Sequence, residues 1–106
     1  EADDYIEMMR REYQRRRDFG TDAINAIPGL SVVKPDGAFY LFVDCSQVEP
    51  DSAKFCARML EEALVATVPG TGFGMDGYFR ISFACGMELL KEGLARIERF
   101  VKNYRG

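Results

Sequence analysis

The chain of 106 residues contains no histidine, only three cysteines and no long apolar run. The cysteines, Cys45, Cys56 and Cys85, are odd in number and widely spaced, which argues against a zinc site and against a disulfide framework. This cysteine usage is typical of a reducing compartment, so we expect a cytoplasmic location. No segment approaches the roughly 18–20 apolar residues of a membrane span, and we expect no membrane partner.

The charge balance excludes a further class of partner. Lysine and arginine number 14 against 17 aspartate and glutamate residues, a net charge of −3, so nothing global favours nucleic acid. Hydrophobic residues make up 47% and charged residues 29% of the chain, an ordinary globular composition. The length suits a single domain, residues 1–106. Because the chain opens in a helical pattern without an initiator methionine, we expect a fragment of a longer protein.

The first 27 residues are predicted to form a connecting helix. Asp3 or Asp4 is placed to cap it, and Pro28 and Gly29 follow its end near Ala26. Gly20 is a weak point at which the helix could break. Five arginines form a basic cluster that we expect to be a solvated face, or else a face that leans on another domain: Arg10, Arg11, Arg15, Arg16 and Arg17.

The rest of the chain alternates between strand and helix patterns. Strands are expected near 31–34, 38–43, 66–68 and 78–83, and helices near 51–64 and 87–103. The segment 38–43 is apolar on both faces, so we expect it to be a central strand covered on both sides. The order α-β-β-α-β-β-α predicts an α+β fold with two layers, in which a mostly antiparallel sheet of three or four strands carries its helices on one face.

One predicted strand carries a single arginine in its middle. Phe79, Ile81 and Phe83 fall on one face by the period of two, whereas Arg80 falls on the other between Tyr78 and Ser82. Arginine has five fixed donors and suits bidentate binding of a carboxylate or phosphate. The alternative is an arginine on an edge strand whose guanidinium reaches solvent.

A glycine-rich loop precedes this strand. Gly72, Gly74 and Gly77 match the G-x-G-x-x-G spacing of dinucleotide-binding loops. That fingerprint requires a strand before it and a helix that opens at it, whereas these glycines lead into the predicted strand 78–83. We therefore interpret them as a tight loop and not as a nucleotide site.

Three motifs in order resemble the C-terminal small domain of class I/II aminotransferases. They are Pro35-Asp36-Gly37-Ala38-Phe39-Tyr40, then Val68-Pro69-Gly70-x-x-Phe73-Gly74, then Arg80-Ile81-Ser82-Phe83-Ala84. The chain is similar to aspartate aminotransferase in these motifs, and Arg16-Arg17-Asp18 resembles the helix that enters the domain. The pattern is shared by aspartate, aromatic and alanine aminotransferases, which are fold-type I enzymes dependent on pyridoxal phosphate.

The resemblance implies a division of labour between two domains. In that family the arginine of the third motif, here Arg80, binds the substrate α-carboxylate, while Phe39 and Phe73 lie near the substrate. The pyridoxal 5'-phosphate and its lysine belong to a large domain whose motifs are missing here, so this chain is expected to hold no catalytic, cofactor-binding or metal-binding residue and to be inactive alone. The parent is expected to be a homodimer that acts on amino acids and 2-oxo acids. Its large domain should cover the Arg80 face, leaving Tyr40, Phe73 and Tyr78 exposed in this chain.

Two other functions compete with this one. A non-enzymatic α+β regulatory module could sense an amino acid or another anion through Arg80, within a pocket closed by this chain or its homodimer. A sheet with exposed aromatics such as Tyr78 and Phe83 could bind RNA, although the acidic balance and the helix at the start of the chain count against this.

Overall fold

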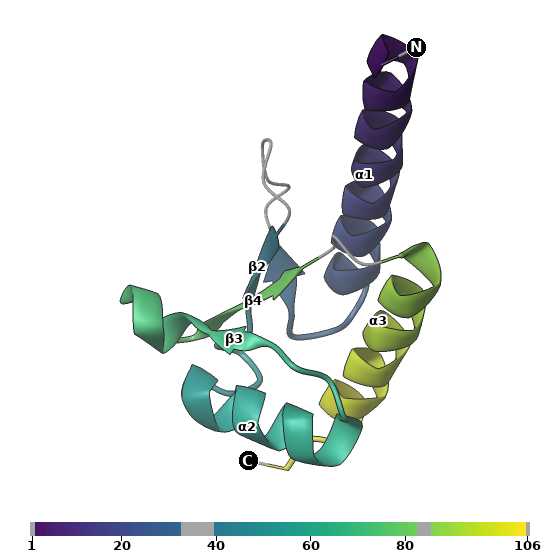
Figure 1. The fold of residues 1–106 in the computed structure, drawn as a ribbon. Helices are drawn as coiled ribbons and strands as arrows, with labels where there is room; N and C mark the ends of the chain where they lie inside the picture. Colours follow the sequence, from purple (N-terminus) through teal and green to yellow (C-terminus); the bar gives the residue numbers. More distant parts are fainter. Residues whose placement is uncertain (1, 33–39, 83–85, 106) are drawn as a thin grey trace.

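The computed structural model describes residues 2–32, 40–82 and 86–105 (Figure 1). Three helices, four strands and one short 3-10 helix occur within these residues: α1 (Ala2–Asn25), β1 (Ser31–Val32), β2 (Tyr40–Asp44), α2 (Ser52–Ala63), β3 (Val68–Pro69), η1 (Gly70–Phe73), β4 (Tyr78–Ser82) and α3 (Met87–Lys102). The predicted order α-β-β-α-β-β-α is confirmed.

The strands form one antiparallel sheet in the order β1-β2-β4-β3. In the central pair, Val43 of β2 lies opposite Phe79 of β4, and Phe42 lies opposite Arg80. On the other side of β4, Val68 of β3 also lies opposite Arg80. The predicted strand near 66–68 begins later than expected, at Val68. Arg80 therefore stands in an interior strand and not at a sheet edge.

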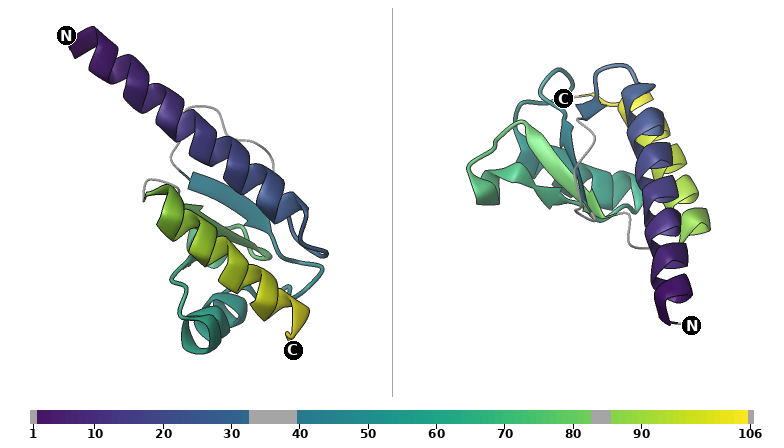
Figure 2. Two further views of the ribbon diagram at one scale, coloured as in Figure 1. Left: turned by 90° about the vertical axis from the view of Figure 1, so that its right-hand side faces the viewer. Right: turned by 90° about the horizontal axis from the view of Figure 1, so that it is seen from above.

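The two faces of the sheet differ in what covers them. Leu41, Val43, Phe79 and Ile81 point to one face and are buried there. The ring of Phe55 from α2 packs on this face at 5.7 Å from the Phe79 ring, between centroids. Figure 2 shows α1 and α3 side by side on the same side of the sheet. The prediction of a two-layer α+β domain with its helices on one face is confirmed.

The other face corrects the prediction that segment 38–43 is covered on both sides. The side chains of Tyr40 and Phe42 in β2 are 39% and 37% exposed. Strand β2 is central in the sheet, as expected, but none of the described helices covers this second face. An apolar run on both faces predicts burial on both faces, but it does not identify the chain segment that would provide the cover.

Helix α1 corrects three smaller expectations. It begins at Ala2, so Asp3 and Asp4 lie in its first turn and do not cap it. It runs through Gly20 without a break. Within the basic cluster Arg16 is only 8% exposed; its guanidinium lies over the Tyr13 ring at 5.0 Å and its Nε is 3.4 Å from Glu12. A helix brings residues three and four positions apart together, which accounts for both contacts.

The N-terminal half of α1 extends well beyond the sheet (Figures 1 and 2). Its exposed side chains include Tyr5, Ile6 and Met8, each more than half exposed. This shape agrees with the prediction that residues 1–27 connect to another part of a longer protein, which stays a prediction.

The two later helices are built as their sequences indicate. Asp51 is the N-cap of α2, where its carboxylate accepts a hydrogen bond from the Lys54 amide at 3.1 Å. Leu64 ends the helix in the left-handed region with φ of 58°. In α3 the buried residues Leu90, Leu94, Ile97 and Phe100 form one apolar face.

Candidate functional site

The open face of the sheet is the candidate site, and Arg80 lies at its centre. Alternation in β4 buries Phe79 and Ile81 against the helices and turns Arg80 to the opposite face, where it is partly exposed. Phe42 on one side and Val68 on the other are its direct neighbours across the sheet. The sequence prediction that Arg80 lies outside the helix-covered core is confirmed.

Arg80 lies over the ring of Tyr40. The guanidinium carbon is 4.2 Å from the ring centroid. In the register of the sheet Tyr40 pairs with Ser82, so Arg80 and Tyr40 are diagonal neighbours, a separation that a long side chain spans easily. Stacking uses the flat face of the guanidinium, whereas a carboxylate is bound by the N–H groups in its plane, so the two contacts are compatible.

Apolar side chains surround the arginine on this face. Tyr40 and Phe42 on β2 and Val68 on β3 are 39%, 37% and 39% exposed, and these two strands flank β4, which carries Arg80. Tyr40 was predicted to be exposed, and this is confirmed; Tyr78 is partly exposed. A charged group beside apolar surface interacts more strongly with an opposite charge once a partner excludes water.

The other two predicted substrate-binding residues lie outside what the structure describes. Phe39 falls in the segment 33–39, and the side chain of Phe73 is likewise outside the described residues. Their proposed proximity to the substrate therefore stays a prediction. Within the described residues the three sequence motifs meet in the sheet, where Tyr40 of β2 lies opposite Ser82 of β4 and Val68 of β3 lies opposite Arg80 of β4.

The glycine-rich loop joins β3 to β4 and does not open a helix at its last glycine. It consists of η1 and a turn in which Gly74 and Gly77 have φ of 73° and 89°. Gly77 directly precedes β4, so the geometry that a dinucleotide site needs is not present here. A Cβ atom on Gly70 would stand 2.2 Å from the Met75 carbonyl oxygen, which explains why the loop needs glycine at that position.

Sequence reasoning missed one residue of this loop. Asp76 accepts hydrogen bonds from Ser52 at the start of α2 and from Thr71 within the loop. These bonds, together with one from the Gly77 amide, hold the pKa of Asp76 below its ordinary value. The pairing of Asp76 with Ser52 spans 24 positions, so no local pattern indicates it.

The described cysteines are not poised for chemistry. Cys45 and Cys56 are both buried and free of disulfides. Burial raises the pKa of Cys45 to about 12 and raises the pKa of Cys56 as well. A thiol with a raised pKa carries little thiolate, the nucleophilic form, at neutral pH. Among the described residues there is also no group of three or more side chains that could hold a metal ion.

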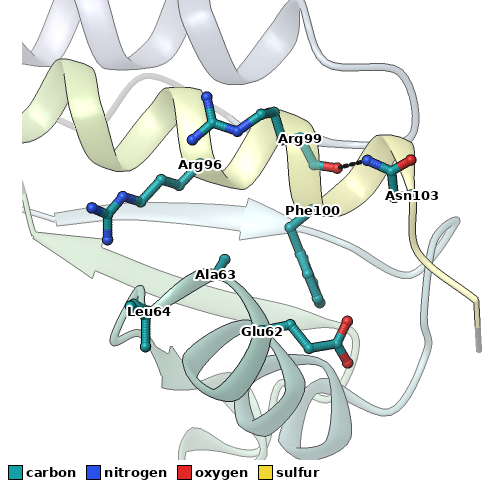
Figure 3. A pocket seen from close by; sticks show the side chains of 7 residues that line it. All are labelled: Glu62, Ala63, Leu64, Arg96, Arg99, Phe100 and Asn103. Carbon is teal, nitrogen blue, oxygen red and sulfur yellow. Dashed lines mark hydrogen bonds between the residues drawn. The ribbon is translucent and has the colours of Figure 1, made fainter.

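A pocket of about 480 Å³ lies between the end of α2 and α3, on the helix layer and not on the Arg80 face (Figure 3). Arg96 and Arg99 contribute to its lining. Arg96 is bonded to Glu92 at 2.7 Å, and the Arg99 guanidinium points away from α2 in Figure 3. Because the two guanidinium groups do not converge, we assign no anion site to this pocket.

No helix in the described part of the chain is long and apolar enough to cross a membrane.

Comparison with known proteins identifies relatives over almost the whole chain. A family model described as aminotransferase class I and II matches residues 1–97. A probable aspartate/prephenate aminotransferase of Aquifex aeolicus is 42% identical over 99 residues, which are 91% of this chain and 25% of the relative. A probable N-acetyl-LL-diaminopimelate aminotransferase of Bacillus subtilis is 45% identical over 100 residues, which are 92% of this chain and 25% of the relative.

Solved structures agree with these relatives. The alanine aminotransferase of Pyrococcus furiosus superimposes with a TM-score of 0.90 at 37% identity, over 95% of this chain and 26% of the other. The chain thus spans about a quarter of the length of the proteins that it matches.

Proposed function

Because the chain belongs to the class I and II aminotransferase family, we propose that it recognises the substrate carboxylate in a pyridoxal phosphate-dependent aminotransferase. The full-length protein would transfer an amino group from an amino acid to a 2-oxo acid. The observation that carries the proposal is the placement of Arg80 in an interior strand, on the open face, with its guanidinium over Tyr40.

Arg80 is the residue proposed to bind the α-carboxylate. Its guanidinium offers parallel N–H donors that match the two oxygens of a carboxylate, and charge-assisted hydrogen bonds of this kind are worth about 1.5–3 kcal/mol each. Tyr40 limits the positions that the guanidinium adopts, which reduces the entropy lost when substrate binds. A carboxylate held at two points orients the rest of the amino acid toward the reacting groups.

The described residues of this chain do not fit the cofactor by themselves. An imine-forming lysine must lie in a desolvated site against the cofactor. Lys54 is on α2, where it is 45% exposed and 3.5 Å from Glu49, while Lys91 and Lys102 are exposed on α3. All three are on the helix layer, whereas Arg80 is on the open face of the sheet. We therefore propose that the preceding part of the protein holds pyridoxal phosphate.

The proposed partner of the open face is that same preceding part of the protein. Tyr40, Phe42 and Val68 form an apolar surface that a large domain would cover, placing Arg80 at the boundary between the two domains. We also propose that the full-length protein is a homodimer and that it is cytoplasmic. The buried free thiols of Cys45 and Cys56 are consistent with a reducing compartment. The relatives include aspartate/prephenate, N-acetyl-LL-diaminopimelate and alanine aminotransferases, so we propose an amino acid as donor.

The test is a panel of amino donors with 2-oxoglutarate as acceptor, assayed on the full-length protein supplied with pyridoxal phosphate. We expect saturable formation of the oxo acid from at least one donor and an absorbance typical of the bound cofactor. Cofactor binding with loss of a leaving group and no exchange of amino groups would point to a related lyase. Failure to bind the cofactor, together with tight binding of an amino acid, would favour the regulatory module instead.

A further inference from the structure

The carboxylate oxygen Oδ1 of Asp76 is the centre of a hydrogen-bond network between the glycine-rich loop and α2. It accepts bonds from the Ser52 amide at 3.1 Å, the Ser52 hydroxyl at 2.9 Å, the Thr71 hydroxyl at 3.2 Å and the Gly77 amide at 3.2 Å. The hydroxyls of Ser52 and Thr71 are 2.9 Å apart. Ser52 is fully buried, so the network joins a buried residue of α2 to both ends of the loop.

The network also completes the N-terminus of α2. Asp51 accepts from the Lys54 amide, and Asp76 accepts from the amide of Ser52, the first residue of the helix. The first amides of a helix have no partner within the helix, and negative charge there is stabilised by the helix dipole. Two carboxylates from different segments therefore satisfy this helix end, and one of them belongs to the loop.

The loop held in this way borders Arg80 on two sides. It begins at Gly70, directly after β3, whose Val68 lies opposite Arg80. It ends at Gly77, directly before β4, which carries Arg80. The Gly77 carbonyl also accepts from the Cys45 amide at 2.8 Å, which extends the attachment to the end of β2. Movement of the loop would therefore displace the strands on which the candidate site is built.

We propose that Asp76 is a positioning residue, which fixes loop 70–77 against α2 so that β3, the loop and β4 hold Arg80 as one rigid body. This inference rests on the proposed function, because it assigns Asp76 a role in the carboxylate site that Arg80 forms. A residue that only stabilised the fold would lower the melting temperature without a selective effect on substrate binding. A positioning residue changes KM as well, since a loosened loop leaves Arg80 in the correct place for only part of the time.

The experiment uses the full-length protein with the variants Asp76→Ala, Asp76→Asn and Thr71→Val. Thr71→Val removes one donor to Asp76 and leaves the carboxylate in place, so it remains informative if Asp76→Ala folds poorly. Glu61→Ala is the control, because Glu61 is an exposed carboxylate on α2, the helix to which Asp76 is bonded, and lies outside the loop. Steady-state kinetics and amide hydrogen exchange of loop 70–77 are measured on each variant.

We expect Asp76→Ala to raise the KM for the amino donor about tenfold while kcat changes by less than about threefold. Exchange of the loop amides, among them those of Gly74 and Met75, should accelerate by about tenfold or more. Asp76→Asn keeps an acceptor oxygen and should recover part of both effects, whereas Glu61→Ala should change neither. Unchanged loop exchange in Asp76→Ala would overturn the proposal, and so would faster exchange with an unchanged KM.

Arg80→Leu separates this inference from the proposed function. It should abolish most of the activity while leaving exchange of loop 70–77 as in the unaltered protein. If the unaltered protein transfers no amino group, the proposed function is wrong and Asp76 loses its role in a carboxylate site. The exchange data then decide only whether Asp76 holds the loop.

Discussion

Gly20 of α1 lies so close to Leu41 of β2 that a Cβ atom on Gly20 would stand 2.9 Å from the Leu41 Cδ1. Leu41 is fully buried, so its side chain has little room to move away. The glycine thus permits a close approach of helix and sheet, and the helix passes through it without a break. Sequence patterns identify a helical glycine as a weak point, whereas the structure shows a packing reason for it.

Gly20→Ala should lower the free energy of unfolding. A methyl group there overpacks the core at a cost of about 1–3 kcal/mol, and the better helix propensity of alanine returns about 1 kcal/mol. We expect a net loss of about 1 kcal/mol, measured by urea unfolding of the 106-residue chain. Gly93→Ala in α3 is the matched control: no atom lies within 4 Å of its added Cβ, so stability should rise by about 0.5–1 kcal/mol. Equal effects at both positions would contradict the packing argument.

Arg80→Leu in the full-length protein should reduce kcat/KM for the amino donor by about a hundredfold or more, equivalent to about 3 kcal/mol of lost interaction. Arg80→Lys should recover only part of this, because a point charge cannot make a bidentate contact. Steady-state kinetics of both variants provide the measurement, and cofactor absorbance serves as the control, which should be unchanged. Near-normal kcat/KM in Arg80→Leu would make Arg80 a structural residue.

The 106-residue chain alone should form no stoichiometric imine with pyridoxal phosphate. The described lysines are on the helix layer, and none of them is a buried group that could bind the cofactor in a desolvated site. Borohydride reduction after incubation with the cofactor, followed by peptide mass spectrometry, should give scattered substoichiometric labels. The full-length protein, treated in the same way, should be labelled on a lysine outside this chain. Complete labelling of a single lysine within the 106 residues would refute the prediction.

Tyr104 should make the stability of the chain depend on alkaline pH. Burial and a 2.6 Å hydrogen bond to Glu49 raise its pKa from the ordinary 10.0 to about 12. Because the pKa is higher in the folded than in the unfolded state, the stabilisation is complete below pH 10 and is lost as the pH rises through about 12. Urea midpoints measured across this range should fall less steeply in Tyr104→Phe. Tyr5→Phe, at an exposed tyrosine, should behave like the unaltered chain.

Much of the fold could be predicted from the periodicity of the sequence. Alternation in 78–82 assigns Phe79 and Ile81 to one face and Arg80 to the other, because successive side chains of any strand point to opposite sides. The apolar stripe of α3 and the cap at Asp51 follow from local geometry in the same way. The motifs also identified the family, and hence Arg80 as the residue to examine.

Only the tertiary structure decided which residues meet across long separations. Leu41 packs against Gly20, and Ser52 bonds to Asp76, although no local period relates these segments. The exposure of Tyr40 on the open face likewise follows from how the segments pack together. An apolar residue carries the free energy of burial whatever covers it, and a carboxylate accepts hydrogen bonds from any donor within reach. Sequence alone therefore determined which residues should be buried or polar, and the packing of α1, α2 and the sheet determined their partners.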